Sequence, residues 1–341
     1  ALQNPIDGGV AQAPGVEAKE IFLPTSALNL KWSFTDSFSA EAYYKLDWEE
    51  STLPGVGSYL SASDTTGPGA QRILLGPLGA ADVKQAIKPD DDDQYGLTLR
   101  YLTDNGTNFD FSYTKSHANI PGALVVIDLA NRDNSFSREV FLEDIEVWQA
   151  SFSTLVSEAQ VYADIAYSDN APFVNTAQDF NGGIITASAV ERGHYYQVVA
   201  GMTDVYTAFK WLSEQISLVF EVNYQGNNKG GDDKDDTTYV VTEDAWGYQF
   251  RLTPKYFSVI PGMDMEVPIT FKHDVSGYGN GNAMNNGLTE DVKTASIGVD
   301  AFYLTNWQFS ANYAWYFGND EPEDRTLDDR DNFAISVKYV F

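Results

Sequence analysis

The chain has 341 residues, with 21 Lys and Arg against 49 Asp and Glu, so its formal net charge is −28. It has no Cys and only three His, which excludes a disulfide framework and a structural zinc site built from Cys and His. The acidic balance argues against nucleic acid as a partner, because phosphate backbones attract basic surfaces. The longest uninterrupted apolar run, 123–127, is far shorter than the roughly 18 residues of a membrane-spanning helix.

Apolar and polar residues alternate with a period of two along much of the chain. The first two such segments run from Leu28 to Phe34 and from Phe38 to Trp48, with a tight turn between them. Because successive side chains of a strand point to opposite faces, each segment predicts a strand with one apolar face. Together the two segments predict a hairpin.

Segments of the same kind continue to the end of the chain. They lie at 95–101, 109–113, 148–152, 161–167, 196–202, 216–224, 246–252, 265–271, 295–303, 307–315 and 333–341. The total is about 13 strands, and roughly ten residues is the length with which a tilted strand crosses a bilayer. Short connections alternate with long ones, and the long ones span 49–93, 118–142, 169–193, 226–243, 274–289 and 318–331.

Short turns on one side and long loops on the other are typical of outer-membrane barrels, as are aromatic residues at strand ends. Trp32, Trp48 and Trp307 are examples of such aromatic residues. A soluble β-sandwich would have a more aliphatic apolar face, and a lipocalin-like barrel would have about eight strands. We therefore predict an all-β fold, an antiparallel transmembrane β-barrel of the bacterial outer membrane over 27–341, preceded by a lead-in segment at 1–26.

Several short motifs resemble one known family. They are Asn4-Pro5-Ile6-Asp7, Leu46-Asp47-Trp48-Glu49, the stretch 94–101 and the stretch 108–113. These motifs resemble the family catalogued as domain of unknown function 1302, whose members look like outer-membrane proteins of Gram-negative bacteria. In that family the Asn-Pro-Ile/Val-Asp motif follows several earlier strands. The resemblance therefore implies that this chain corresponds to the C-terminal two-thirds of a member, with 16–18 strands in a complete chain.

The odd strand count supports the same expectation, because bacterial single-chain barrels have even numbers of strands. The last strand ends in Phe341. This ending resembles the terminal signal of outer-membrane barrels, which implies recognition by the barrel-assembly machinery. Other expected partners are outer-membrane lipids, lipopolysaccharide and a periplasmic or envelope protein.

Alternation also predicts which charged side chains face the barrel interior. The predicted lumen-lining residues are Lys31, Glu41, Lys45, Arg100, Asp110, Lys115, Glu221, Arg251, Lys272 and Asp300. Their signs are mixed, so they do not indicate a filter ring of one charge. Two interpretations stay open at this point: pore lining, or paired charges that brace the barrel interior.

The acidic residues are clustered rather than uniform. Asp90, Asp91, Asp92 and Asp93 form an unbroken run, and carboxylates are the ligands that Ca²⁺ and Mg²⁺ prefer. Loosely bound Ca²⁺ or Mg²⁺, bridging to lipopolysaccharide phosphates, is one interpretation of this run, and a solvated acidic loop is the other. No other cofactor is expected.

Two long loops contain unusually apolar segments. The residues concerned are Leu74, Leu75 and Leu78 in the first, and Leu124, Val125 and Val126 in the second. They predict a capture site for a hydrophobic ligand or a hatch that folds inward, and the alternative is a small packed core or a strand extension above the membrane.

The predicted function is accordingly a channel or transporter for hydrophobic or amphipathic, lipid-like small molecules. The alternative is a non-transporting structural or assembly-partner barrel. An outer-membrane esterase is a weaker hypothesis, because Ser116 and His117 are adjacent on a strand and face opposite ways. We therefore do not expect an enzyme.

Overall fold

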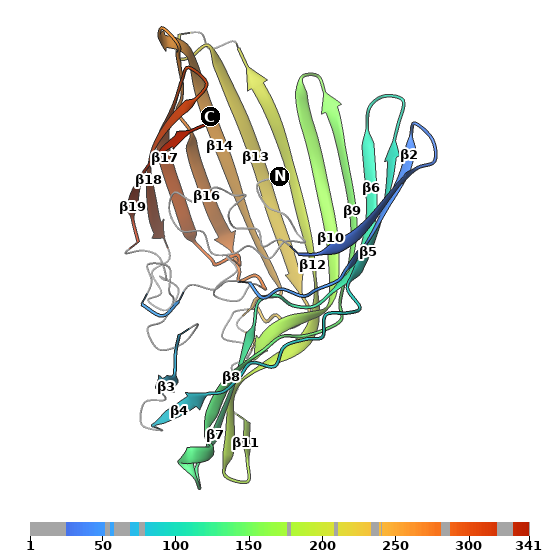
Figure 1. Cartoon of the computed structure of the whole chain (residues 1–341), viewed down its shortest axis with the longest axis vertical. Coiled ribbons are helices and arrows are strands. Elements are labelled where there is room, and N and C mark those ends of the chain that lie inside the picture. The colour runs from blue at the N-terminus through green and yellow to red at the C-terminus, as the bar shows by residue number, and fades with distance from the viewer. Residues whose placement is uncertain are drawn as a thin grey trace.

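The computed structural model describes residues 25–51, 55–57, 69–74, 79–175, 179–207, 211–232, 239, 241–280, 287–318 and 330–340. Across these residues the chain folds into one large curved sheet with a smaller sheet projecting from its long-loop side (Figure 1). No helix in this part of the chain is long and apolar enough to cross a membrane.

The large sheet, called the wall, consists of thirteen antiparallel strands across the described residues, as the alternation predicts. They are β1 (Ala27–Ser33), β2 (Phe38–Lys45), β5 (Tyr95–Leu102), β6 (Asn108–Ser116), β9 (Ile145–Val156), β10 (Ala159–Asn175), β12 (Ile184–Tyr206), β13 (Gln215–Asn227), β14 (Asp244–Ile260), β15 (Met263–Glu266) with β16 (Ile269–Ser276), β17 (Val292–Tyr303), β18 (Trp307–Gly318) and β19 (Asn332–Tyr339). Each pairs with the next in chain order.

The elements β15 and β16 form one interrupted strand, because both pair with β14 on one side and β17 on the other. The interruption contains Pro268, which has no N–H to donate to a ladder. The carbonyl of Pro268 still accepts a hydrogen bond from Gly298 N at 2.8 Å. The break is therefore local and the sheet continues across it.

Among the described residues, β1 pairs only with β2 and β19 only with β18. The wall is thus an open trough in this structure, with β1 and β19 at its two edges (Figure 1). Short turns lie at the top of Figure 1 and long connections at the bottom. One short turn contains Gly106 at φ 83°, in the left-handed region that glycine adopts without strain.

The convex face of the wall is apolar and exposed, as a lipid-facing surface requires. Phe111 is 56% and Ile165 50% exposed on it. Aromatic residues form a belt near the long-loop end, where Trp148 lies between Tyr113 and Tyr167 with ring centroids 5.4 and 5.9 Å apart. The belt continues to Tyr196, which lies opposite Tyr167 in the register. We call this set the outer aromatic belt.

A second set of aromatics lies at the short-turn end. On β18, Trp307 and Trp315 are eight residues apart, or about 26 Å at roughly 3.3 Å per residue. At a strand tilt of about 40° this is about 20 Å of height, close to the apolar band of about 25 Å that outer-membrane barrels present to lipid. The wall therefore has the dimensions and the polarity of an outer-membrane β-barrel.

The long connections contain further strands, which extend the predicted loops into an ordered structure. They are β3 (Arg72–Leu74), β4 (Ala80–Val83), β7 (Gly122–Asp128), the 3-10 helix η3 (Arg132–Asn134), β8 (Phe136–Val140) and β11 (Asp179–Asn181). β7 pairs with β8 and with the start of β12, and β4 pairs with β8 in parallel. We call this unit the outer protrusion.

A small packed core lies just beyond the outer belt, where β10 and β12 extend out of the wall. Phe173 is fully buried there, with its ring 6.5 Å from that of Tyr195 and 6.4 Å from that of Tyr239. A side chain at Gly193 would place its Cβ 2.6 Å from the Phe173 ring. Glycine at this position therefore permits the packing that holds the extended strands together.

Candidate functional site

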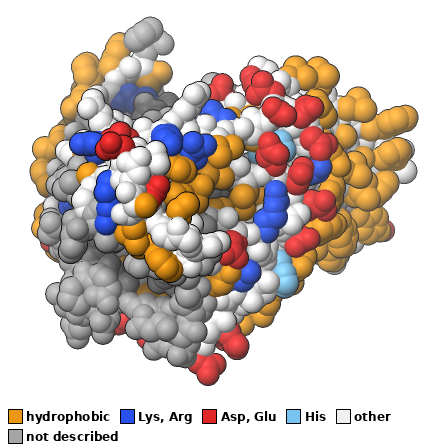
Figure 2. Space-filling view, turned by 90° about the horizontal axis from the view of Figure 1, so that it is seen from below, with side chains coloured by type: hydrophobic (Ala, Val, Ile, Leu, Met, Phe, Trp, Pro, Cys, Tyr) orange, Lys and Arg blue, Asp and Glu red, His pale blue; other side chains and the backbone are white. Residues whose placement is uncertain are grey.

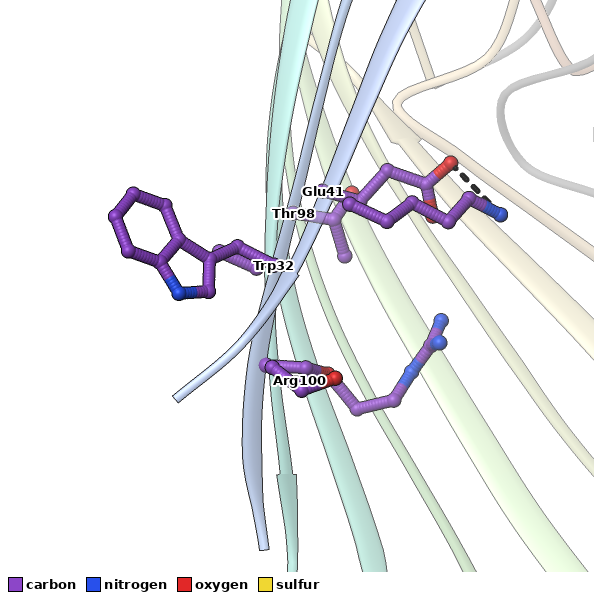
Figure 3. A pocket seen from close by; sticks show the side chains of 8 residues that line it. Trp32, Glu41, Thr98 and Arg100 are labelled. Carbon is purple, nitrogen blue, oxygen red and sulfur yellow. Dashed lines mark ion pairs between the residues drawn. The ribbon is translucent and has the colours of Figure 1, made fainter. Parts of the chain in front are cut away.

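The concave face of the wall carries the charged side chains that alternation assigns to the interior. Figure 3 shows Glu41, Thr98 and Arg100 on the concave side of the sheet, whereas Trp32 points away on the convex side. Lys31 Nζ lies 3.2 Å from Glu41 Oε1, and Arg100 Nε lies 2.7 Å from Asp110 Oδ1. Lys31, Glu41, Thr98 and Arg100 border a recess of about 190 Å³ near the short-turn end of β1 and β2.

A second recess, of about 260 Å³, lies further along the same face. Its lining residues are Asp110, Ser151, Phe152, Ser153, Gln160, Tyr162, Asp164 and Thr203. All but Phe152 are polar, and Asp110 is the residue that pairs with Arg100. The concave surface in this region therefore consists of polar groups of both signs.

The middle of the wall contains a buried carboxylate. Glu221 on β13 is only 1% exposed, and its partners include Tyr162 Oη at 2.5 Å and Gln249 Nε2 at 2.9 Å. Next to it, Gln197 Nε2 donates to Asn223 Oδ1 at 2.9 Å. Charge-assisted hydrogen bonds of this kind fix side chains rigidly because both carboxylate oxygens are occupied.

The remaining interior positions differ in how they are held. Asp300 on β17 accepts a hydrogen bond from Ser310 Oγ. Lys272 Nζ lies 3.0 Å from Asp274 Oδ2 at the outer end of β16. Lys45 ends β2, opposite Ala27. Arg251 is exposed and has no ion pair within the described residues.

At the outer rim, Lys115 joins two loops that are far apart in sequence. Its Nζ contacts Asp93 and lies 2.9 Å from Asp144 Oδ1. The hydrogen bond from Lys115 holds the pKa of Asp144 below its ordinary value. Lys115 therefore acts as a link between the 90–93 run and the loop before β9.

His117 is buried beside this link. Asp144 N donates to His117 Nδ1 at 3.2 Å, so Nε2 carries the proton and donates to the carbonyl of Asp92 at 2.9 Å. Both ring nitrogens are thus used to fasten loop backbone. This imidazole is bound to main-chain groups through both nitrogens, so it is not free to act as a base for the esterase hypothesis.

The carboxylates of the 90–93 run make separate contacts with the protein and do not surround a common centre. Asp91 Oδ1 accepts from Trp48 N at 3.0 Å, and Asp93 contacts Lys115. Within the described ranges, no group of three or more acidic or histidine side chains could hold a metal ion. Binding of Ca²⁺ or Mg²⁺ by Asp90, Asp91, Asp92 and Asp93 stays a prediction.

The predicted capture residues are only partly within the described structure. Leu124, Val125 and Val126 lie on β7 and are half-buried. Leu74 ends β3, but its side chain is outside the described part, as are Leu75, Leu78 and the terminal Phe341. The apolar run at 122–128 is therefore a strand of the outer protrusion, between β8 and β12.

Sequence reasoning missed two features of this surface. The first is the Tyr162–Glu221 hydrogen bond, which joins strands 59 residues apart and has no local signal. The second is a pair of cations on the outer protrusion, where Lys84 and Arg138 both contact the ring of Phe136. The only sign of this arrangement in the sequence is that Phe136 and Arg138 are two residues apart, which places them on one face of a strand.

Several solved structures are similar to this chain at low sequence identity. OmpT of Vibrio cholerae is 11% identical over 92% of this chain and 88% of its own, with a TM-score of 0.39. OprB of Pseudomonas putida is 13% identical over 91% and 70%, with a TM-score of 0.41. OccAB4 of Acinetobacter baumannii is 10% identical over 92% and 63%, with a TM-score of 0.40.

No curated protein matches the chain. The family model described as "Protein of unknown function (DUF1302)" matches residues 1–341, the whole of the sequence. This agrees with the resemblance of the motifs at 4–7, 46–49 and 94–101. The chain therefore belongs to the DUF1302 family of proteins of unknown function.

Proposed function

We propose that the protein is an outer-membrane channel or transporter that takes up hydrophobic or amphipathic, lipid-like small molecules. The observation that carries the proposal is the continuity of β12. This strand has 23 residues, from Ile184 in the outer protrusion to Tyr206 at the short-turn end of the wall. Its first residues pair with the apolar strand β7, and its later residues form the wall. A ligand held on β7 is therefore next to a strand that leads across the membrane.

Exposed apolar groups at the outer end of this path support capture. Phe180 on β11 is 65% exposed and Ile184 is 44% exposed, at the tip where β11 and β12 meet. Apolar residues at an exposed tip are accessible to a hydrophobic ligand that approaches from outside. The concave wall below presents charges of both signs in ion pairs, which suits passage of a polar or charged headgroup.

The proposal is tested by making the apolar strand polar. The double substitution Leu124→Ser and Val126→Ser, at two positions on one face of β7, removes half-buried carbon atoms worth about 0.8 kcal/mol per CH₂ equivalent. We expect uptake of a fluorescent fatty acid into protein-containing liposomes to fall roughly tenfold if the ligand contacts both side chains. Leu129→Ser, just beyond β7 and 38% exposed, is the matched control and should leave uptake unchanged.

Barrel assembly is monitored in each variant by heat-modifiable mobility on gels. Normal uptake by a well-assembled double variant would remove β7 as the capture strand. Absence of flux and of ion conductance in the unmodified protein would remove the channel itself.

A non-transporting role as a structural or assembly partner is the second candidate. It is favoured by exposed apolar residues at two short turns, where Trp211 is 82% and Leu155 70% exposed. These residues would contact a periplasmic or envelope protein. Planar-bilayer recording separates the two candidates, since a purely structural barrel gives neither current nor ligand flux. Contact with lipopolysaccharide through divalent cations at Asp90–Asp93 would be compatible with either.

A further inference from the structure

The outer protrusion contains two cations that share one aromatic ring. Lys84 Nζ lies 4.0 Å from the centroid of Phe136, and Arg138 Cζ lies 4.9 Å from it. Lys84 N donates to the carbonyl of Ser137 at 2.7 Å, which extends the parallel pairing of β4 with β8. This pairing brings Lys84 beside Arg138. Two positive groups are therefore held next to each other by backbone geometry.

Neither cation is neutralised within the described part of the protein. Neighbouring cations, in contrast, form ion pairs: Arg72 Nε lies 2.6 Å from Asp82 Oδ1, and Lys88 Nζ lies 2.5 Å from Glu50 Oε2. No such ion pair involves Lys84 or Arg138 among the described residues. In addition, Arg138 Nε is buried and has no hydrogen-bond partner there. An unsatisfied buried donor is unfavourable, and an acceptor bound beside this guanidinium would stabilise it.

Apolar side chains lie on the same face of the sheet. In the β7–β8 register, Leu124 is opposite Arg138 and Val126 is opposite Phe136. All four residues are half-buried. Figure 2, seen from the long-loop side, shows Lys and Arg gathered with hydrophobic side chains on the projecting part of the molecule. The surface thus combines positive charge with apolar area.

The height of this surface separates it from the lipid headgroups. On β12, Thr186 pairs with Val126 of β7, and Tyr196 belongs to the outer aromatic belt. Ten residues of strand between them span about 33 Å at roughly 3.3 Å per residue, or about 25 Å of height at a strand tilt of about 40°. The headgroup region extends only about 5–8 Å beyond the hydrocarbon on each side. Phospholipid headgroups do not reach so far, and we therefore take the ligand to be a diffusible molecule.

We propose that Lys84, Phe136 and Arg138, with Leu124 and Val126, bind the anionic headgroup and adjacent chain of a free amphiphile, a fatty-acid-like carboxylate. This inference rests on the proposed function and names its substrate class. The two cations beside Phe136 hold the carboxylate by their charge. The half-buried Leu124 and Val126 cover the first methylene groups of the chain.

The test measures binding of laurate and of a neutral dodecyl analogue to the full-length protein in a neutral detergent. We expect laurate to bind at least tenfold more tightly than the neutral analogue. The double variant Lys84→Gln, Arg138→Gln should lose that preference without changing affinity for the neutral analogue. Arg132→Gln, an exposed cation at η3 on the same protrusion, is the matched control and should change laurate affinity by less than twofold.

The charge-conserving double variant Lys84→Arg, Arg138→Lys guards against a folding defect and should retain most of the preference. Equal binding of laurate and the neutral analogue by the unmodified protein overturns the proposal. So does an unchanged laurate preference in the glutamine variant. Flux is measured separately with the neutral analogue: if it is absent while laurate preference persists, the channel function fails and the anion site stands.

Discussion

The sharpest energetic expectation concerns the hydroxyl of Tyr162. Its Oη lies 2.5 Å from Oε1 of Glu221, a carboxylate that is 1% exposed. Hydrogen bonds to charged groups contribute about 1.5–3 kcal/mol. The tyrosine ring also lies over Gly201, whose added Cβ would be 2.6 Å from Tyr162 Oη. Tyr162→Phe keeps this ring packing and removes only the donor, so we expect a loss near the upper end of that range, about 2–3 kcal/mol.

Equilibrium denaturant unfolding in phospholipid vesicles, followed by Trp fluorescence, gives the free energy of unfolding. Tyr101→Phe is the matched control, because Tyr101 is 48% exposed on the lipid face. Its effect should stay within about 0.5 kcal/mol. Glu221→Gln completes a double-mutant cycle, in which the coupling to Tyr162 should exceed about 1 kcal/mol. Equal losses for the two Tyr→Phe variants, or a coupling near zero, would refute the reasoning.

Two further expectations concern the outer side. Lys115→Met removes the group that lowers the pKa of Asp144 in the folded protein. A carboxyl group whose pKa is lower in the folded than in the unfolded state stabilises the fold at pH values above its unfolded pKa, here 3.8. This stabilisation is lost as the pH falls through the pKa of the folded state. Unfolding measured from pH 5 downward should therefore show a shallower acid loss in this variant, and an unchanged slope would contradict the role of the link. Gly122→Ala would place a Cβ 1.6 Å from Val190 Cγ2, so β7 should detach from β12. Limited proteolysis should then cut the protrusion while the heat-modifiable mobility of the wall is retained; resistance equal to that of the unmodified protein would show that the contact relaxes.

The wall was predictable because lipid and water select opposite residue types on its two faces. On β18, Trp307 and Phe309 are exposed on the convex side, while Ser310 between the apolar positions contacts Asp300. This contrast imposes a period of two on the sequence wherever the strand crosses the membrane. The positions of the thirteen wall strands, and the faces of Glu41 and Arg100, followed from that period alone.

The outer protrusion was not predictable in the same way. Beyond the outer belt, both faces of a strand meet protein or water, so the alternation that marks 196–202 does not identify the first part of β12, from Ile184. Similarly, 123–127 is an apolar run without a period, because Leu124 and Val125, on opposite faces of β7, are both half-buried. The parallel contact of β4 with β8 joins residues more than fifty positions apart. Such pairing depends on tertiary packing, which a local pattern does not encode.

The net charge of −28 and an anionic ligand are compatible because of electrostatic screening. At physiological ionic strength the Debye length is about 8 Å, so distant carboxylates contribute little at the Lys84–Arg138 pair. The net negative charge of the molecule repels laurate, whereas Lys84 and Arg138 attract it. Added salt changes laurate affinity in opposite directions in these two cases. If the whole-molecule charge dominated, added salt would screen repulsion and strengthen binding. If the adjacent cations dominate, as the geometry around Phe136 indicates, added salt should weaken binding between 20 and 200 mM. Laurate titrations at three salt concentrations measure the sign directly, and stronger binding at high salt would contradict the local-cation mechanism.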